Sequence, residues 1–156
     1  LIQSIGGGNT MLFNRATREI LCSLPPRNKI VSHDWLVYQV VTAVGGQIRY
    51  GDAAGLRYRQ HAENLTGSNI GFDARMVRMK SFLHGRFKDW NEANLAALAP
   101  LRPRMTPENR RTYDLFAASR DGGVIHRLRL LRRSGVYRQG ALENVGLFVG
   151  AILGRL

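Results

Sequence analysis

The segment of residues 30–35 constrains the fold of this chain most, because an apolar, strand-like run ends in it and a helix of about three turns is expected to start there. The Ser32 hydroxyl can cap the first free backbone N–H groups of that helix. Asp34 falls in the first turn, where the positive end of the helix dipole favours an ionised carboxylate. Apolar residues at helical spacing follow and predict one buried face: Val37, Val40, Val41 and Val44. The sequence therefore predicts that this helix holds His33, Asp34 and Trp35 rigidly at an edge of the fold.

The first part of the chain is expected to alternate strands and helices, as α/β proteins do. A short helix is predicted at residues 14–24, ended by Pro25-Pro26. Three short apolar segments are the predicted strands: residues 1–5, 47–50 and 56–60.

The second part is expected to be helical. Its predicted helices are residues 71–87, residues 89–98, a helix beginning at Thr106-Pro107, and residues 124–133 after Gly122-Gly123. Residues 137–156 are apolar but too rich in glycine to predict a membrane span. The chain is thus divided into an α/β part, residues 1–70, and a helical extension, residues 71–156.

Positive charge gathers in the second part of the chain. Residues 1–73 hold 7 basic and 5 acidic residues, whereas residues 74–156 hold 16 and 6, and the formal net charge is +12. Arginine accounts for 20 of the 23 basic residues, and its planar guanidinium group suits phosphates and lipid headgroups. Nucleic acid, an anionic membrane surface and a phosphorylated substrate are therefore open as partners. A genome that favours arginine codons is the non-functional alternative.

Polar residues follow the glycine-rich turn and the predicted strands. Asn9 follows Gly7-Gly8, His33 and Asp34 follow one strand, and Tyr58-Arg59-Gln60-His61 ends another, with Asn64 just beyond. Strand ends at one edge of an open α/β sheet form the ligand crevice, so these groups are expected to converge.

In that crevice Asp34 is a candidate general base, although the helix dipole alone also explains a carboxylate in the first turn. Arg59 is a candidate partner for phosphate, or else a surface residue. His61 is a candidate metal ligand or hydrogen-bond donor, or else a turn residue. Other site patterns are absent from the sequence: the glycines lack the dinucleotide-binding spacing, and the single Cys22 cannot form a disulfide or a structural zinc site with the scattered histidines.

Three motifs stand in order along the first 70 residues. They are Gly7-Gly8-Asn9-Thr10-Met11-Leu12-Phe13-Asn14-Arg15, then Ser32-His33-Asp34-Trp35, then Tyr58-Arg59-Gln60-His61 with Asn64 and Gly67. Together they resemble the second half of a bacterial family 2 glycosyltransferase of the rhamnosyltransferase-like kind, which builds surface polysaccharides such as O-antigen. The resemblance covers residues 1–70 in these motifs and the arginine-rich tail more loosely. It implies the C-terminal half of a GT-A fold and an inverting transfer of a sugar from a nucleotide-sugar donor to a saccharide or lipid-linked acceptor.

The resemblance also implies roles for individual residues. Asp34 matches the catalytic base, which takes the proton from an acceptor hydroxyl. Gly7, Gly8 and Asn9 match donor- or acceptor-binding positions, Trp35 would wall the acceptor site, and His33 stands where many relatives carry a glutamate. Residues 58–61 would close over the donor diphosphate, where Arg59 and His61 offset charge on the departing nucleotide.

The family uses a divalent metal, Mg²⁺ or Mn²⁺, held mostly by Asp-x-Asp carboxylates in its first half. Those carboxylates have no counterpart in the 156 residues, of which His61 is the one expected metal ligand. The isolated chain is therefore expected to be inactive, as the C-terminal half of a longer enzyme.

The basic tail is expected to dock on the anionic inner face of the bacterial plasma membrane, which predicts a cytoplasmic, peripheral protein. The alternative is a basic module that binds nucleic acid or a membrane surface without catalysis. Nucleic acid is disfavoured, because residues 117–136 contain no aromatic side chain that could stack on bases.

Overall fold

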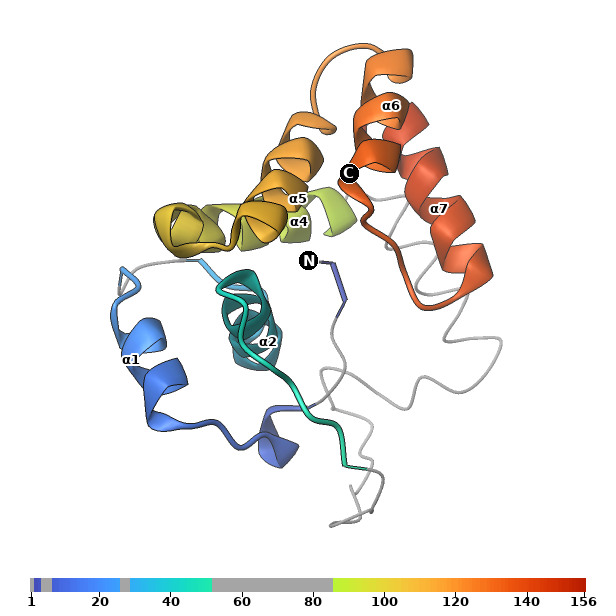
Figure 1. The fold of residues 1–156 in the computed structure, drawn as a ribbon. Coiled ribbons are helices and arrows are strands. Elements are labelled where there is room, and N and C mark those ends of the chain that lie inside the picture. The colour runs from blue at the N-terminus through green and yellow to red at the C-terminus, as the bar shows by residue number, and fades with distance from the viewer. Residues whose placement is uncertain (1, 4–6, 26–28, 52–85) are drawn as a thin grey trace.

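The protein is described by a computed structural model that covers residues 2–3, 7–25, 29–51 and 86–156. Within these ranges the chain is largely helical and no residue lies in a strand. In chain order the elements are the 3-10 helix η1 (Gly8–Thr10), α1 (Arg15–Cys22), α2 (His33–Ala43), α4 (Arg86–Leu98), the 3-10 helix η2 (Ala99–Arg104), α5 (Pro107–Ala118), α6 (Val124–Ser134) and α7 (Ala141–Ile152) (Figure 1).

The helices begin and end at local signals in the sequence. The Asn14 side chain accepts a hydrogen bond from the Thr17 N–H at 2.9 Å and caps α1. The Thr106 side chain accepts one from the Asn109 N–H at 3.2 Å and caps α5, whose first residue is a proline. Gly135, with a left-handed φ of 69°, ends α6. The predicted helices in the described ranges are confirmed, except that α4 is continuous from Arg86 to Leu98, where the sequence predicts a break at Lys88 between two helices.

The expected strands differ from the structure. Residues 47–50 and the apolar pair before Ser32 form no strand, nor do the described residues of the segment 1–5. A strand needs a neighbour to pair its backbone groups, and no described residue pairs with these segments as a strand. The predicted strand at 56–60, most of the predicted helix 71–87 and the division at residue 70 lie outside the described residues.

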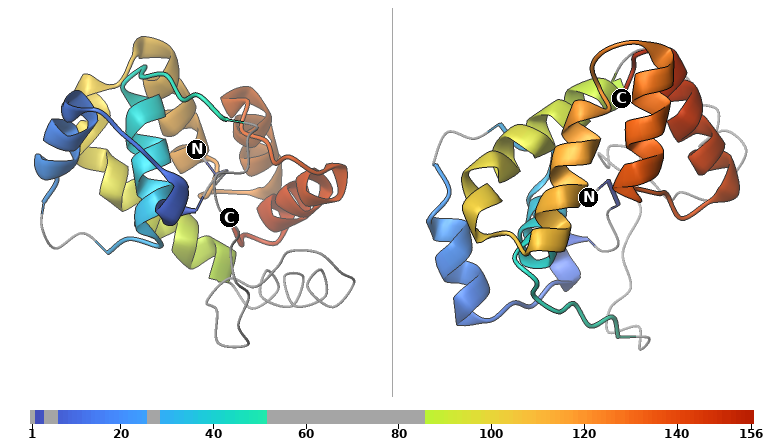
Figure 2. Two further views of the ribbon diagram at one scale, coloured as in Figure 1. Left: turned by 90° about the horizontal axis from the view of Figure 1, so that it is seen from below. Right: turned by 45° about the horizontal axis from the view of Figure 1, so that its top comes forward.

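The helices form two packed pairs joined by a central layer. α1 packs against α2, and α6 packs against α7, while α4 and α5 lie between the two pairs (Figures 1 and 2). α2 contacts both α4 and α5, and α5 contacts α6. None of the helices in the described ranges has the length and apolar character needed to cross a membrane.

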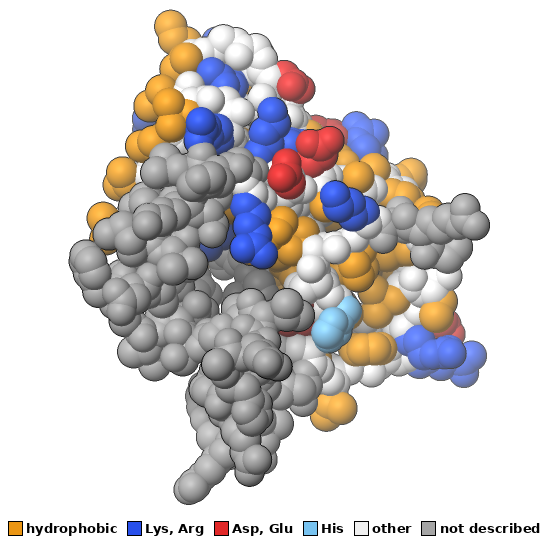
Figure 3. Space-filling view, turned by 180° about the vertical axis from the view of Figure 1, so that it is seen from behind, with side chains coloured by type: hydrophobic (Ala, Val, Ile, Leu, Met, Phe, Trp, Pro, Cys, Tyr) orange, Lys and Arg blue, Asp and Glu red, His pale blue; other side chains and the backbone are white. Residues whose placement is uncertain are grey.

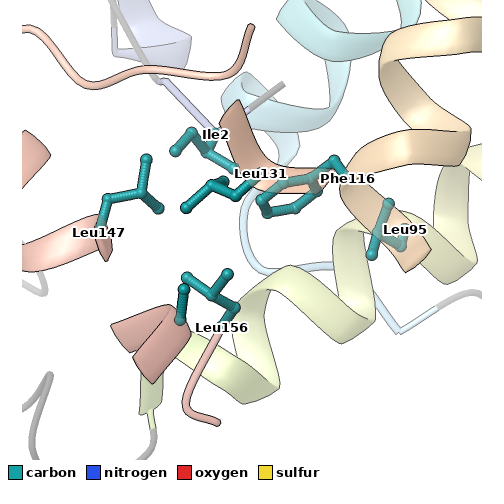
Figure 4. Packing of buried hydrophobic residues seen from close by; sticks show 7 residues of the cluster. Ile2, Leu95, Phe116, Leu131, Leu147 and Leu156 are labelled. Carbon is teal, nitrogen blue, oxygen red and sulfur yellow. The ribbon is translucent and has the colours of Figure 1, made fainter. Parts of the chain in front are cut away.

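Two apolar cores hold this arrangement together. The first core gathers around Phe116, which is 1% exposed, and brings the N-terminal Ile2 against α6 and α7 (Figure 4). Its members are Ile2, Leu95, Phe116, Leu131, Leu147, Ala151 and Leu156. The second core lies under α2 and consists of Val40, Ala43, Leu98, Leu101 and Met105. Tyr113 of α5 packs against both cores.

Candidate functional site

The N-terminal end of α2 and the glycine turn before α1 meet in space. Gly7 precedes η1, and the Thr10 hydroxyl and N–H both donate to the Gly7 carbonyl, at 2.8 and 3.0 Å, which closes the turn. The His33 ring lies against Gly8, so closely that a Cβ atom on Gly8 would collide with its Nε2 atom. The structure therefore brings together two of the motifs that the sequence placed at one site, although they lie 25 residues apart.

Glycine is needed at position 8 because of this contact, not because of its backbone angles. Gly8 has no positive φ, so a residue with a side chain could adopt its backbone conformation. The space that a Cβ would need is occupied by the imidazole. The glycine turn thus packs directly against the His33 ring.

The Asp34 carboxylate is held beside His33 by hydrogen bonds. Its Oδ1 accepts from the Trp35 N–H at 2.8 Å, and it is also hydrogen-bonded to the Ser32 side chain. Burial raises the pKa of the Asp34 carboxyl, but the hydrogen bonds from Ser32 and Trp35 and the charge of His33 outweigh it, so the pKa lies below its usual value. Asp34 is partly exposed and, as expected, ionised at neutral pH.

Ser32 has a different role from the one expected. It occupies the N-cap position of α2 with extended backbone angles, but its side chain makes no capping hydrogen bond. Its carbonyl accepts from the Leu36 N–H at 3.1 Å, which starts the helix. The Ser32 side chain is hydrogen-bonded to the Asp34 carboxyl instead. Serine side chains often bond to groups two residues further along the chain, and at the start of a helix such groups lie within reach.

Trp35 lies behind the site. Its side chain is only 6% exposed, and its ring meets that of Trp90 edge to face, with centroids 6.0 Å apart. The Arg86 guanidinium lies 4.9 Å from the centroid of the Trp90 ring. Trp35 therefore fixes α2 against α4 and offers little surface to a ligand.

Trp90 and Arg86 are residues that sequence reasoning missed. The chain has two tryptophans, and they stand 55 residues apart, so the sequence gives no local signal that they pair. Nothing in the local sequence indicates that α2 and α4 pack together.

Of the remaining expected site residues, the structure describes only the backbone position of Asn9. Asn9 lies within η1 and follows Gly8, the residue against which His33 packs. Tyr58, Arg59, Gln60, His61 and Asn64 lie outside the described residues.

The metal that the resemblance implies has no set of ligands in the described part of the chain. No group of three or more His, Cys, Asp or Glu side chains gathers there. His33 and Asp34 supply two such side chains at most, and His61 is outside the described ranges. His33 and Asp34 are side chains that can take part in proton transfer and hydrogen bonding.

Comparisons with protein-family models, with curated proteins and with solved structures found no match to this chain.

Proposed function

We propose that this chain supplies the acceptor side of an inverting glycosyltransferase, with Asp34 as the general base. The observation that supports this most is the contact between the Gly8 turn and His33, because it brings the glycine motif to the helix start that carries the ionised Asp34. The three motifs that resemble a family 2 glycosyltransferase supply the reaction class. The resemblance also supplies the GT-A fold, of which the described residues would be the helical portion.

In the proposed step, an acceptor hydroxyl lies next to the Asp34 carboxylate. Its oxygen attacks the anomeric carbon of the donor sugar while the bond from that carbon to the nucleotide diphosphate breaks on the opposite face. The hydroxyl proton passes to Asp34, and the bonding electrons leave with the diphosphate. The product is a glycoside of inverted configuration, which fits a base that is unprotonated before the reaction.

The supporting residues have simple roles in this proposal. Ser32 and the Trp35 N–H keep the carboxylate ionised and fix its direction. His33, seated on Gly8, presents a ring that can donate a hydrogen bond to a sugar or phosphate oxygen. The divalent metal of the family would be held by residues other than those described.

The experiment uses the protein at the full length its gene encodes. It measures release of nucleoside diphosphate from a panel of nucleotide-sugars, with saccharide and lipid-linked acceptors. We expect Asp34→Asn to lower kcat by about 10²–10⁴-fold while the thermal unfolding midpoint changes little. Asp121→Asn, which removes an exposed carboxylate between α5 and α6, is the matched control and should keep full turnover. Wild-type rates in the Asp34→Asn protein, or no consumption of any nucleotide-sugar, would overturn the proposal.

A further inference from the structure

The outer face of α7 is entirely apolar and has no partner in the described structure. Six large apolar residues fall within an arc of about 140° of this helix and the residue after it. They are Leu142, Val145, Phe148, Val149, Ile152 and Leu153, with exposed fractions from 40% to 77%. Isolated exposed apolar residues are ordinary, but a continuous face of this kind marks an interaction surface.

The opposite face of α7 makes the contacts with the rest of the protein. Leu147, Gly150 and Ala151 are buried there, and Leu147 and Ala151 belong to the first core. The Arg127 guanidinium of α6 donates to the Ile152 carbonyl at 3.1 Å and packs on Gly154. The apolar face is therefore held outward by a well-fixed helix.

Positive charge lies on α6, the helix that packs against α7. α6 contains four arginines and no acidic residue, and Arg129, Arg132 and Arg133 are exposed. The single acidic residue of α7, Glu143, is off the apolar face and pairs with Arg138 at 3.3 Å. Figure 3 shows hydrophobic side chains along the edge formed by α6 and α7, with basic side chains next to them.

We propose that the α6–α7 edge docks on an anionic lipid surface, with α7 lying in the plane of the membrane. Its apolar face would enter the boundary between headgroups and acyl chains, and the α6 arginines would contact lipid phosphates. This inference does not depend on the proposed catalytic function.

The dimensions favour a helix that lies on the membrane over one that crosses it. α7 has 12 residues, a length of about 18 Å, whereas the hydrocarbon core is about 30 Å thick. A second copy of the chain fits the face less well, because a two-fold interface would bring the arginines of two α6 helices together.

The test is flotation of the purified protein with two kinds of vesicle, each at low and at high salt. One kind is phosphatidylcholine alone, and the other also contains phosphatidylglycerol at about 30 mol%. We expect binding to the anionic vesicles that weakens with salt. Each arginine is worth about fivefold in affinity, so R129Q/R132Q should bind about 30-fold more weakly. R18Q/R111Q removes two other exposed arginines with the same change in charge and should bind like the wild type.

Two further variants test the apolar face. Val149→Glu places a charge in it and should abolish flotation without changing the far-ultraviolet circular dichroism. Phe148→Trp adds a fluorophore to the face, and its emission should shift to the blue on anionic vesicles. The proposal would be overturned by equal binding to neutral vesicles or by full binding of R129Q/R132Q. It would also be overturned by a lipid-free dimer that Val149→Glu dissociates, because such a dimer would assign the face to a second copy of the chain.

Discussion

At the scale of single residues, the site depends on two residues that determine the surroundings of His33 and Asp34. Ser32 acts on the Asp34 carboxyl, and Gly8 acts on the His33 ring by leaving room for it. Neither Ser32 nor Gly8 carries a charge. Both can be changed with little effect on the cores, which lie elsewhere.

Replacing Ser32 by alanine should raise the pKa of Asp34, because a hydrogen bond to the charged form is lost. In the folded wild type this pKa lies below its unfolded value of about 3.9. Asp34 therefore stabilises the protein above about pH 4, and that contribution is lost as the pH falls through the folded pKa. A carboxyl ¹³C NMR titration measures the change. Ser23→Ala, which removes a hydroxyl bonded to the Ile20 carbonyl, should leave the Asp34 titration unaltered.

Replacing Gly8 by alanine should displace the His33 ring, because the new Cβ occupies its position. The exposed ring can move, so we expect the free energy of unfolding to fall by less than about 1 kcal/mol. The His33 ring resonances should shift, and kcat/KM of the proposed transfer should fall. Gly51→Ala is the control, since its Cβ would meet no atom within 4 Å. Unchanged His33 resonances in Gly8→Ala would show that the ring does not rest on this turn in solution.

At the scale of helices, the sequence predicts what is decided locally. Asn14 at the start of α1, Thr106-Pro107 at the start of α5 and Gly122-Gly123 before α6 are short-range signals, and the structure has a helix boundary at each. The sequence predicts a break at Lys88 between two helices, whereas α4 runs through this residue without interruption.

Pairing between distant segments is what the sequence does not reveal. Short apolar runs such as residues 47–50 satisfy the pattern of a strand, but whether they become one depends on a partner strand. The same limit applies to the site. The ionised Asp34 follows from its place in the first turn of α2, whereas the contacts of His33 with Gly8 and of Trp35 with Trp90 depend on packing between segments far apart in sequence.

At the scale of the whole molecule, Tyr113 links the two cores. Its ring packs against both, and its hydroxyl donates to the Leu95 carbonyl of α4 at 2.9 Å. Burial and the charge of Asp114 raise the pKa of Tyr113, with Arg102 opposing them, so the hydroxyl stays protonated and able to donate at neutral pH. α5, which carries Tyr113, contacts α2 on the side of the candidate site and α6 on the other (Figure 1).

Tyr113→Ala should therefore destabilise both halves of the protein together. We expect the free energy of unfolding to fall by about 3 kcal/mol, at the lower end of the range for large aromatic side chains because Tyr113 is only partly buried. Tyr113→Phe loses only the hydrogen bond and should lower it by about 1 kcal/mol. Urea unfolding followed by tryptophan fluorescence reports the contact of α2 with α4, and circular dichroism reports all helices. In the wild type and in Tyr113→Phe the two transitions should coincide.

The exposed Tyr137, changed to alanine, is the control and should alter stability by less than about 0.5 kcal/mol. Separate fluorescence and dichroism transitions in the wild type would mean that the cores unfold independently, and the position of the site relative to the α6–α7 edge would then not be fixed by Tyr113.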